Sequence, residues 1–200
     1  SQGNPFFLSQ LSSHAAHSAR SDFSRSESVG PAITGSILAD LRDLTSGARE
    51  LATCGAVLGA PFELPLAAAL ADQYPEEAVR NIDELGARGF VAPLARSSFT
   101  FRHPILATVI YQSVPPGQRI ALHGKAAALL KEAGVDTVSA ARHIALSASV
   151  GDMSDVDYIV AAGLQIRGRA PRAATSLFAA AFELIPETGP TAGRAARVLG

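Results

Sequence analysis

Apolar residues recur at helical spacing along this chain from residue 37 onward, and Pro or Gly interrupts the pattern at short intervals. A short amphipathic helix cannot bury its apolar face alone, so helices of this length pack against one another. Short connections between them favour antiparallel pairs. The sequence therefore predicts a mainly α fold built from short helices.

The first part of the chain does not follow this pattern. Residues 12–34 are rich in Ser and carry few large apolar side chains, which predicts a flexible linker. This linker separates a short apolar segment, residues 1–11, from the globular region that begins at residue 35. Because Ser1 opens the chain and an apolar segment follows at once, we interpret the chain as an inner piece of a larger protein.

Residues 35–114 have the element order of a winged-helix domain. Helices are expected from Ile37, from a cap at Thr45 or Ser46, from Pro65 and from Pro75. Two short strands then follow around a polar turn at residues 96–98. Helices followed by a small β-hairpin are typical of a winged helix.

Residues 115–200 are expected to form the start of a helical-repeat region. A helix that begins at His103 and Pro104 ends at the Pro115–Pro116 pair, and further helices are predicted at 117–133, 137–150, 152–168 and 171–185. In the last pair of helices, 152–168 and 171–185, we expect residues of the first helix to face residues of the second. These are Ala161, Ala162 and Leu164 against Ala173, Ala174, Leu177, Phe178, Ala181 and Phe182. Residues 174–186 resemble the second helix of a tetratricopeptide-type repeat.

The sequence lacks the motifs of the common enzyme classes. It has no GxxxxGK[ST] phosphate loop, no GxGxxG, no HExxH and no Gx[SC]xG, so we expect no catalytic residues and no complete enzyme. The five histidines give no paired metal-ligand spacing except His14 and His17, which we expect to lie in solvent, so no metal site is predicted. Cys54 is expected to be a small buried residue.

Charge and hydropathy argue against nucleic acid and membrane as partners. The formal net charge of −1 gives no global attraction to nucleic acid or to an anionic membrane. No apolar stretch approaches the roughly 20 residues that a membrane span needs. A single cysteine fits a reducing compartment, and we expect a cytoplasmic location.

Residues Gly3 to Leu8 read Gly-Asn-Pro-Phe-Phe-Leu, the most specific short feature of the chain. Gly permits close approach of a ligand, and Pro5 suits the first turn of a helix. The segment resembles the GNPF(F/Y)L motif of the STAND-type ATPases found in large LuxR-family regulators and MalT-like proteins. The resemblance implies that Gly3 and Pro5 lie in the ATPase lid, with the proline against the adenine of bound nucleotide. A purely structural helix start is the alternative.

A second motif spans Phe99 to Leu106 and is similar to the FRHPLL…AVY stretch of the same family. A histidine where a strand ends and a helix begins can offer an N–H to a phosphate, and the helix N-terminus adds a positive field. The resemblance implies that His103 is a sensor for the nucleotide diphosphate, with Arg102 as a weaker neighbour. Alternatively, His103 caps its own helix or packs in the core.

Two further segments, Ala48 to Phe62 and Pro115 to Ala128, resemble the family as well, and there we expect His123 to pack between helices. The chain departs from the family pattern in its Ser-rich insertion after Leu11. It also lacks the phosphate loop, the Walker B strand and the C-terminal helix-turn-helix. The resemblance therefore implies ATP or ADP in the intact parent protein, with no cofactor expected for this segment alone.

These expectations together predict an internal regulatory segment of an ATP-dependent LuxR-family transcriptional regulator. The winged helix would be a nucleotide-sensing clamp on the ATPase core of the same parent chain, and the repeats would bind a protein or small-molecule inducer. DNA would be bound only through the absent helix-turn-helix, and no membrane would be involved.

Two alternatives stay open. The winged helix could bind DNA through the helix from Pro75 to Leu85, although four acidic residues there outnumber Arg80 and would repel phosphates. The same cassette could also belong to a cyclase or kinase signalling protein.

Overall fold

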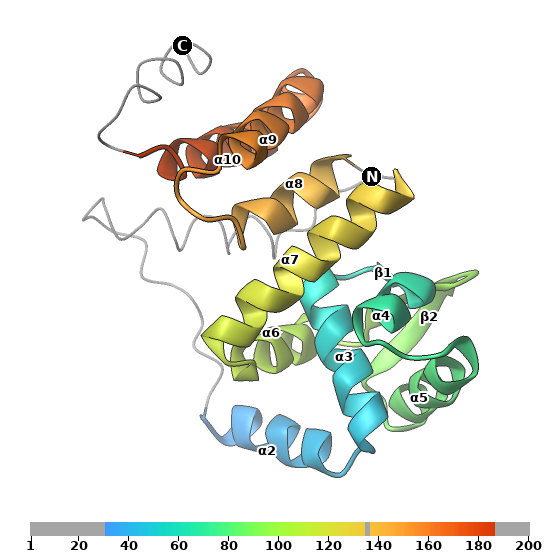
Figure 1. Cartoon of the computed structure of the whole chain (residues 1–200). Helices are drawn as coiled ribbons and strands as arrows, with labels where there is room; N and C mark the ends of the chain where they lie inside the picture. Colours follow the sequence, from blue (N-terminus) through green and yellow to red (C-terminus); the bar gives the residue numbers. More distant parts are fainter. Residues whose placement is uncertain (1–30, 135–136, 187–200) are drawn as a thin grey trace. The chain divides into compact units, whose positions relative to one another are not determined.

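The computed structural model describes residues 31–134 and 137–186 (Figure 1). These residues form a mainly helical protein with a small antiparallel sheet. The elements in order are α2 (Pro31–Arg42), α3 (Ser46–Leu58), β1 (Phe62–Glu63), α4 (Leu64–Leu70), α5 (Pro75–Ala87), β2 (Val91–Ala95), β3 (Ser98–Phe101), α6 (Pro104–Ser113), α7 (Pro116–Ala133), α8 (Thr137–Ala145), α9 (Met153–Ile166) and α10 (Pro171–Glu183).

The described residues belong to two compact units, and the division falls within α7, between Leu122 and His123. We refer to residues 31–122 as the first unit and to the described residues from 123 to 186 as the second unit. Each unit has its own buried apolar residues.

Helix α3 is the centre of the first unit. Thr45 is its N-cap, as predicted, and the Thr45 hydroxyl accepts a hydrogen bond from the backbone N–H of Ala48 at 3.3 Å. The stripe formed by Ala48, Leu51, Ala52 and Gly55 is buried. Helix α3 contacts α4, α5 and α6, and α2 contacts α6. Figure 1 shows α3 running between α4 and α6.

The sheet of the first unit has the strand order β1-β3-β2, with antiparallel pairing throughout. The hairpin from β2 to β3 confirms the predicted pair of strands. Its turn places Arg96 at a φ of 47°, a conformation that favours Gly or Asn over Arg. Strand β1 was not predicted, because two residues are too few to show an alternating pattern. Phe62 of β1 nevertheless pairs with Phe99 and contacts Phe101, with ring centroids 5.7 Å apart.

A chain of amide side chains joins α5 to the start of α3. The side-chain amide of Asn81, which is buried, donates a hydrogen bond to the side-chain oxygen of Gln73 at 2.9 Å. Gln73 in turn donates to the backbone carbonyl of Gly47 at 2.8 Å. Gly47 leaves the space for Asn81, because a Cβ at this position would lie 2.6 Å from the Asn81 amide nitrogen. The buried amide is thus satisfied, as buried polar groups must be.

The second unit consists of the last turns of α7 with α8, α9 and α10, and Figure 1 shows α9 and α10 side by side. Asp152 caps α9 by accepting hydrogen bonds from the backbone N–H groups of Ser154 and Asp155. The helices approach closely at Gly163, where a Cβ would lie 2.5 Å from the Phe178 ring. The core of the unit contains Ala127, Ala141, Ile144, Val156, Ile159, Val160, Ala162, Ile166, Ala174, Leu177, Ala181 and Leu184.

Two predicted boundaries are wrong. Helix α8 ends at Ala145 rather than near residue 150. Just after its end, the Ser147 hydroxyl donates to the backbone carbonyl of His143 at 2.9 Å, a bond that offers the backbone an alternative to continued helix. Helix α2 begins at Pro31, inside the stretch predicted as linker, because Pro suits a first helical turn.

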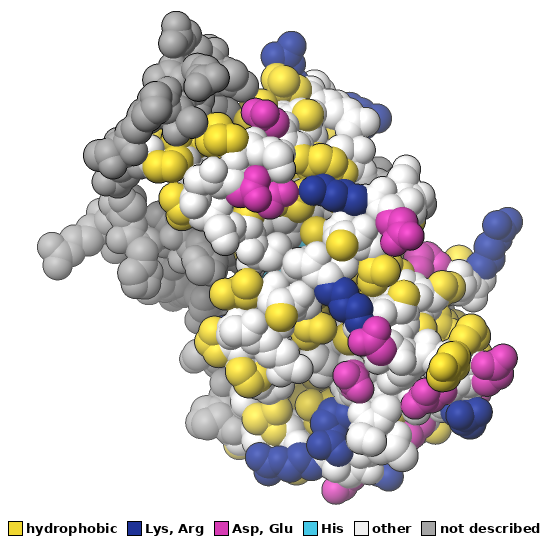
Figure 2. Space-filling view, viewed as in Figure 1, with side chains coloured by type: hydrophobic (Ala, Val, Ile, Leu, Met, Phe, Trp, Pro, Cys, Tyr) yellow, Lys and Arg dark blue, Asp and Glu magenta, His cyan; other side chains and the backbone are white. Residues whose placement is uncertain are grey.

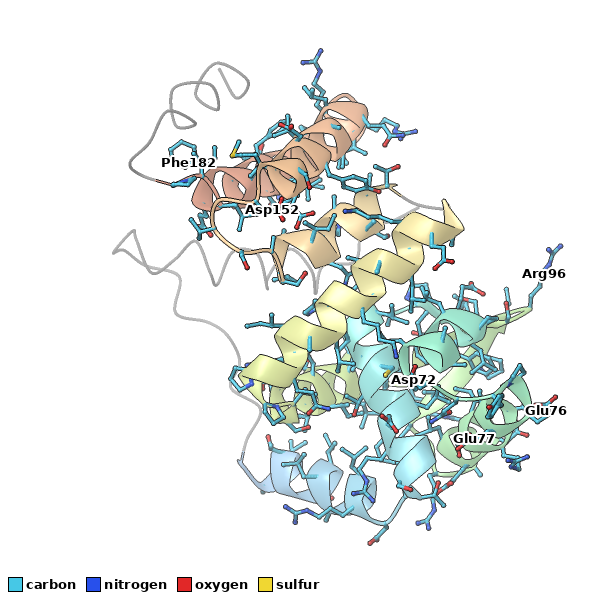
Figure 3. All side chains as sticks on the ribbon, in the orientation of Figure 1. Asp72, Glu76, Glu77, Arg96, Asp152 and Phe182 are labelled. Carbon is cyan, nitrogen blue, oxygen red and sulfur yellow. The ribbon has the colours of Figure 1, made fainter. Side chains whose placement is uncertain are left out.

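The predicted facing residues of α9 and α10 are wrong in part. Ala162, Ala174, Leu177 and Ala181 are buried as expected. Ala161 is exposed, Leu164 is 47% exposed and Phe182 is 64% exposed. Figure 3 shows Phe182 at the end of α10, pointing away from α9. The apolar periodicity predicts a wider buried face than α9 and α10 have. The buried residues of α9 instead include Ile159, Val160, Gly163 and Ile166.

No helix in the described ranges is both long enough and apolar enough to cross a bilayer.

The contact between Gly55 and Phe62 gives a test of close packing in the first unit. A Cβ at Gly55 would lie 2.9 Å from the Phe62 ring, which is itself held against Phe101. We expect Gly55→Ala to lower the free energy of unfolding by about 1–3 kcal/mol, as overpacking does. Urea denaturation measures this change.

The matched control is Gly86→Ala in α5, where nothing lies within 4 Å of the added methyl group. This change should raise the free energy of unfolding by about 0.5–1 kcal/mol through the better helix propensity of Ala. Equal effects of the two changes would contradict the packing of Phe62 on Gly55.

Candidate functional site

The two predicted adenine contacts, Gly3 and Pro5, lie outside the described residues, as do His14 and His17. The other two predicted site residues, Arg102 and His103, are described. The candidate sites among the described residues are the junction of β3 with α6, the exposed face of α5, and a pair of buried histidines on α7 and α8.

Arg102 and His103 lie at the junction between β3 and α6, and both side chains are exposed. The backbone N–H of Arg102 donates to the carbonyl of Phe90 at 3.0 Å, which fixes the chain as it leaves the sheet. His103 is the N-cap residue of α6 with an extended backbone, and its carbonyl accepts from the N–H of Leu106. Its imidazole makes no capping hydrogen bond to α6. His103 therefore neither caps its helix through its side chain nor packs in the core.

This junction has the chemistry of a weak anion site. A guanidinium and an imidazole are exposed on successive residues, directly before a helix whose N-terminus carries partial positive charge. Pro104 occupies the first helical position, where a missing N–H costs no hydrogen bond. Both side chains are thus available to an anionic ligand or to an acidic surface.

Helix α5 presents an acidic face to solvent. Glu76 and Asp83 are exposed, whereas Arg80 is the exposed cation among them. In Figure 3, Glu76 and Glu77 extend outward from the first turn of α5 and Arg96 extends from the hairpin. Figure 2 shows acidic side chains around a hydrophobic patch over this part of the first unit. Glu84 is held by Thr45, whose hydroxyl and backbone N–H donate to its carboxylate and lower its pKa.

The second unit contains a pair of buried imidazoles. His123 of α7 and His143 of α8 are each 2% exposed, and their Nδ1 atoms are 2.7 Å apart. The ring centroids are 5.0 Å apart. The distance between the two Nδ1 atoms is that of a hydrogen bond, so one Nδ1 carries a proton that it donates and the other Nδ1 accepts it.

Burial is the main cause of a lowered pKa at His143, which falls from 6.5 to about 3, and the charges of His123 and Arg142 lower it further. The folded protein therefore binds fewer protons at this site than the unfolded chain between these two values. The stabilisation by neutral His143 is fully present above about pH 6.5 and is lost as the pH falls toward about 3.

The imidazole pair has no third His, Cys, Asp or Glu side chain beside it, among the described residues, with which it could hold a metal ion. Groups of three or more His, Cys, Asp or Glu side chains that could hold a metal ion are absent among the described residues. Cys54 is buried in α3, as predicted. An open depression in the first unit is lined by Ser46, Arg49, Glu50, Thr53 and Gln118 and contains no predicted site residue.

Sequence reasoning placed His123 between helices, which is confirmed by its burial, but it missed the partner. The two histidines are 20 residues apart, which is not a metal-ligand or same-face spacing within one helix. A usable signal was present in the predicted antiparallel pairing of adjacent helices, each of which carries a single histidine on an Ala-rich face.

No family model matches the chain. An uncharacterized protein of Rhizobium meliloti (strain 1021) is 29% identical to it over 182 residues, which cover 84% of this chain and 18% of that protein. The chain thus spans less than a fifth of this relative's length. No solved structure matches.

The hydrogen bond between the imidazoles can be measured by a double-mutant cycle. His143→Leu removes the imidazole that bonds His123 and should lower the free energy of unfolding by about 1–3 kcal/mol, because a buried polar atom loses a partner. Adding His123→Leu should cost less than the single change predicts, because both partners are then apolar. Urea denaturation near neutral pH measures each variant.

The control is His103→Leu, an exposed position where the change should stay within about 0.5 kcal/mol. Additive effects of the two buried substitutions would show that the imidazoles are not bonded to each other.

Proposed function

We propose that this chain is an internal regulatory segment of an ATP-dependent LuxR-family transcriptional regulator of the STAND type. In this proposal, the helices and hairpin of the first unit are a winged-helix domain, and the helices of the second unit begin a tetratricopeptide-like array. The observation that carries the proposal is the position of His103, exposed at a strand-to-helix junction beside Arg102 and uncommitted to capping.

The proposed role of His103 follows from its surroundings. An imidazole before a helix N-terminus can donate to a phosphate while the helix field favours the negative charge. Arg102 adds a second exposed donor at the same junction. The nucleotide would be ATP or ADP held by the ATPase core of the parent chain, with Gly3 and Pro5 on its adenine side. This segment itself performs no hydrolysis in the proposal.

In the parent protein, the winged helix would act as a clamp with two states. Contact of His103 with a nucleotide phosphate would favour the docked state, and nucleotide exchange would release it. A ligand can shift such an equilibrium only by its differential affinity for the two states, so the phosphate contact has to exist in one state alone. The greater length of the Rhizobium relative supports a segment embedded in a large protein.

The second unit is the proposed receiver of the signal. Repeat proteins stack helical hairpins into surfaces that bind a protein or a small-molecule inducer, and the proposal assigns this role to the helices of the second unit. The same cassette in a cyclase or kinase parent would use both units in the same way, because the effector domain lies elsewhere. We also propose that the protein is cytoplasmic.

Direct DNA binding by the winged helix is the competing function, and the charge of α5 opposes it. This helix would have to enter a groove lined by phosphates, yet Glu76, Glu77 and Asp83 surround its one exposed cation. Arg96 is the charged residue at the hairpin turn. A surface of this composition favours a protein over a nucleic acid as the partner.

The sensor role predicts a change in nucleotide affinity. In the full-length protein that contains this segment, His103→Ala should weaken ADP binding about 10-fold, since a hydrogen bond to a charged group is lost. Isothermal titration calorimetry measures the affinity. Arg96→Ala removes an exposed cation from the hairpin of the same unit and should leave the affinity unchanged. Equal ADP affinity of the His103 variant and the natural protein would refute the sensor role.

The clamp proposal also predicts that this 200-residue chain does not bind DNA. Electrophoretic mobility of duplex DNA should be unaffected at about physiological salt, because α5 is acidic. The variant Glu76→Lys/Asp83→Lys reverses two charges on the exposed face and serves as a comparison that should gain weak, salt-sensitive binding. A shift by the unchanged chain, with affinity that falls steeply as salt rises, would favour the DNA-binding alternative.

A further inference from the structure

The buried histidines of the second unit are not used by the proposed nucleotide clamp. Among the described residues, the buried polar side chains are Asn81, His123 and His143. Asn81 is satisfied by Gln73 within the first unit. The two histidines instead join two helices, α7 and α8, through a short contact between titratable groups.

The contact tolerates only certain protonation states. With both rings neutral, one ring has the Nδ1–H tautomer and donates to the bare Nδ1 of the other, which carries its proton on Nε2. A first added proton binds the Nε2 of the donor ring and leaves the hydrogen bond in place, now with a buried charge. A second proton must bind the accepting Nδ1, which opposes two N–H groups and breaks the bond. Opening of the contact is therefore coupled to proton uptake.

The surroundings oppose charge on the pair. The charges that act on His143 come from His123 and Arg142, which are both positive when protonated. Asp155 of α9 is engaged by Lys131 at 3.4 Å, and Asp152 caps α9. Within the second unit, the titratable groups of the elements that carry the pair or pack against α8 are Lys125, Lys131, Glu132, Arg142, Asp152, Asp155, Asp157, Tyr158, Arg172 and Glu183.

His123 lies on the face of α7 that contacts the rest of the second unit. His123, Ala127 and Lys131 are spaced four residues apart, so they share one face of this helix. Ala127 belongs to the core of the second unit, and Lys131 contacts Asp155 and the ring of Tyr158, with 4.6 Å from its Nζ to the ring centroid. An exposed ion pair adds little stability, and Ala buries little area. The imidazole contact adds a buried polar attachment on the same face.

We propose that the His123–His143 pair is an acid-sensitive latch that holds the second half of α7 against α8 and opens when the pair takes up protons. The latch belongs to the second unit and does not depend on the proposed nucleotide clamp. Its ligand is the proton itself. Acidification would expose the α7 face of the array, and neutral pH would close it again.

Hydrogen exchange of the full 200-residue chain tests the latch. After correction for the intrinsic rate of exchange, the opening constant of amides in α7 beyond His123 and in α8 should rise about 30-fold between about pH 7.5 and about pH 5, for one histidine that regains its ordinary pKa on opening. The variant His123→Leu/His143→Leu should lose this dependence, and His103→Gln, a histidine change outside the unit, should keep it. A rise below about threefold in the natural chain, or the full rise in the double variant, would overturn the proposal.

The ring tautomers provide a second measurement on the natural chain, which stays decisive if the double variant does not fold. Long-range proton–nitrogen NMR spectra at about pH 7.5 should show one of the two rings protonated at Nδ1, and the ring of His143 should titrate well below its ordinary pKa of 6.5. Two Nε2-protonated rings, or a titration of His143 at its ordinary pKa of 6.5, would overturn the latch.

Discussion

Close approach of an aromatic ring to a helix glycine is the constraint on which both units depend. In the first unit, the small residues of α3 leave room for Phe62 to lie against Gly55, and in the second unit Phe178 lies against Gly163 in the same manner. Each ring fills a space that a β-carbon would close. Helices this short gain most of their stability from such packing and little from propensity. The junction of β3 with α6 owes its position to the same packing, because Phe62 also contacts Phe101 at the end of β3.

The helices were predictable because periodicity and breakers are local signals. Pro at a first turn, Thr45 as a cap and Gly after a helix identified most element starts and ends. The features that the sequence did not predict depend on contacts between residues far apart in the chain. Strand β1 exists only through its pairing with β3, and the exposure of Phe182 depends on which residues α9 presents to α10. The ends of α8 and α2 were misjudged because a serine hydroxyl and a helix-compatible proline lay within stretches read by composition.

The candidate sites divide in the same way. His103 was found from sequence since its motif is contiguous, and the structure adds that its imidazole is exposed and makes no capping bond to α6. The His123–His143 pair was missed because each residue alone is an ordinary buried histidine, and only the tertiary contact gives them a shared chemistry. One histidine is thus open to a ligand and two are closed to solvent. Their environments, rather than their residue type, separate a binding role from a proton-linked one.

The small sheet of the first unit has a further consequence for association. With the order β1-β3-β2, its two edges are β1 and β2. Strand β1 has two residues, and β2 contains Pro93 followed by a register shift before Ala95. A proline and a bulge remove the regular row of donors and acceptors that an incoming strand needs, and a two-residue edge offers too few. The exposed Leu94 therefore sits on an edge that resists growth of the sheet between molecules, which protects the hairpin from aggregation through strand addition.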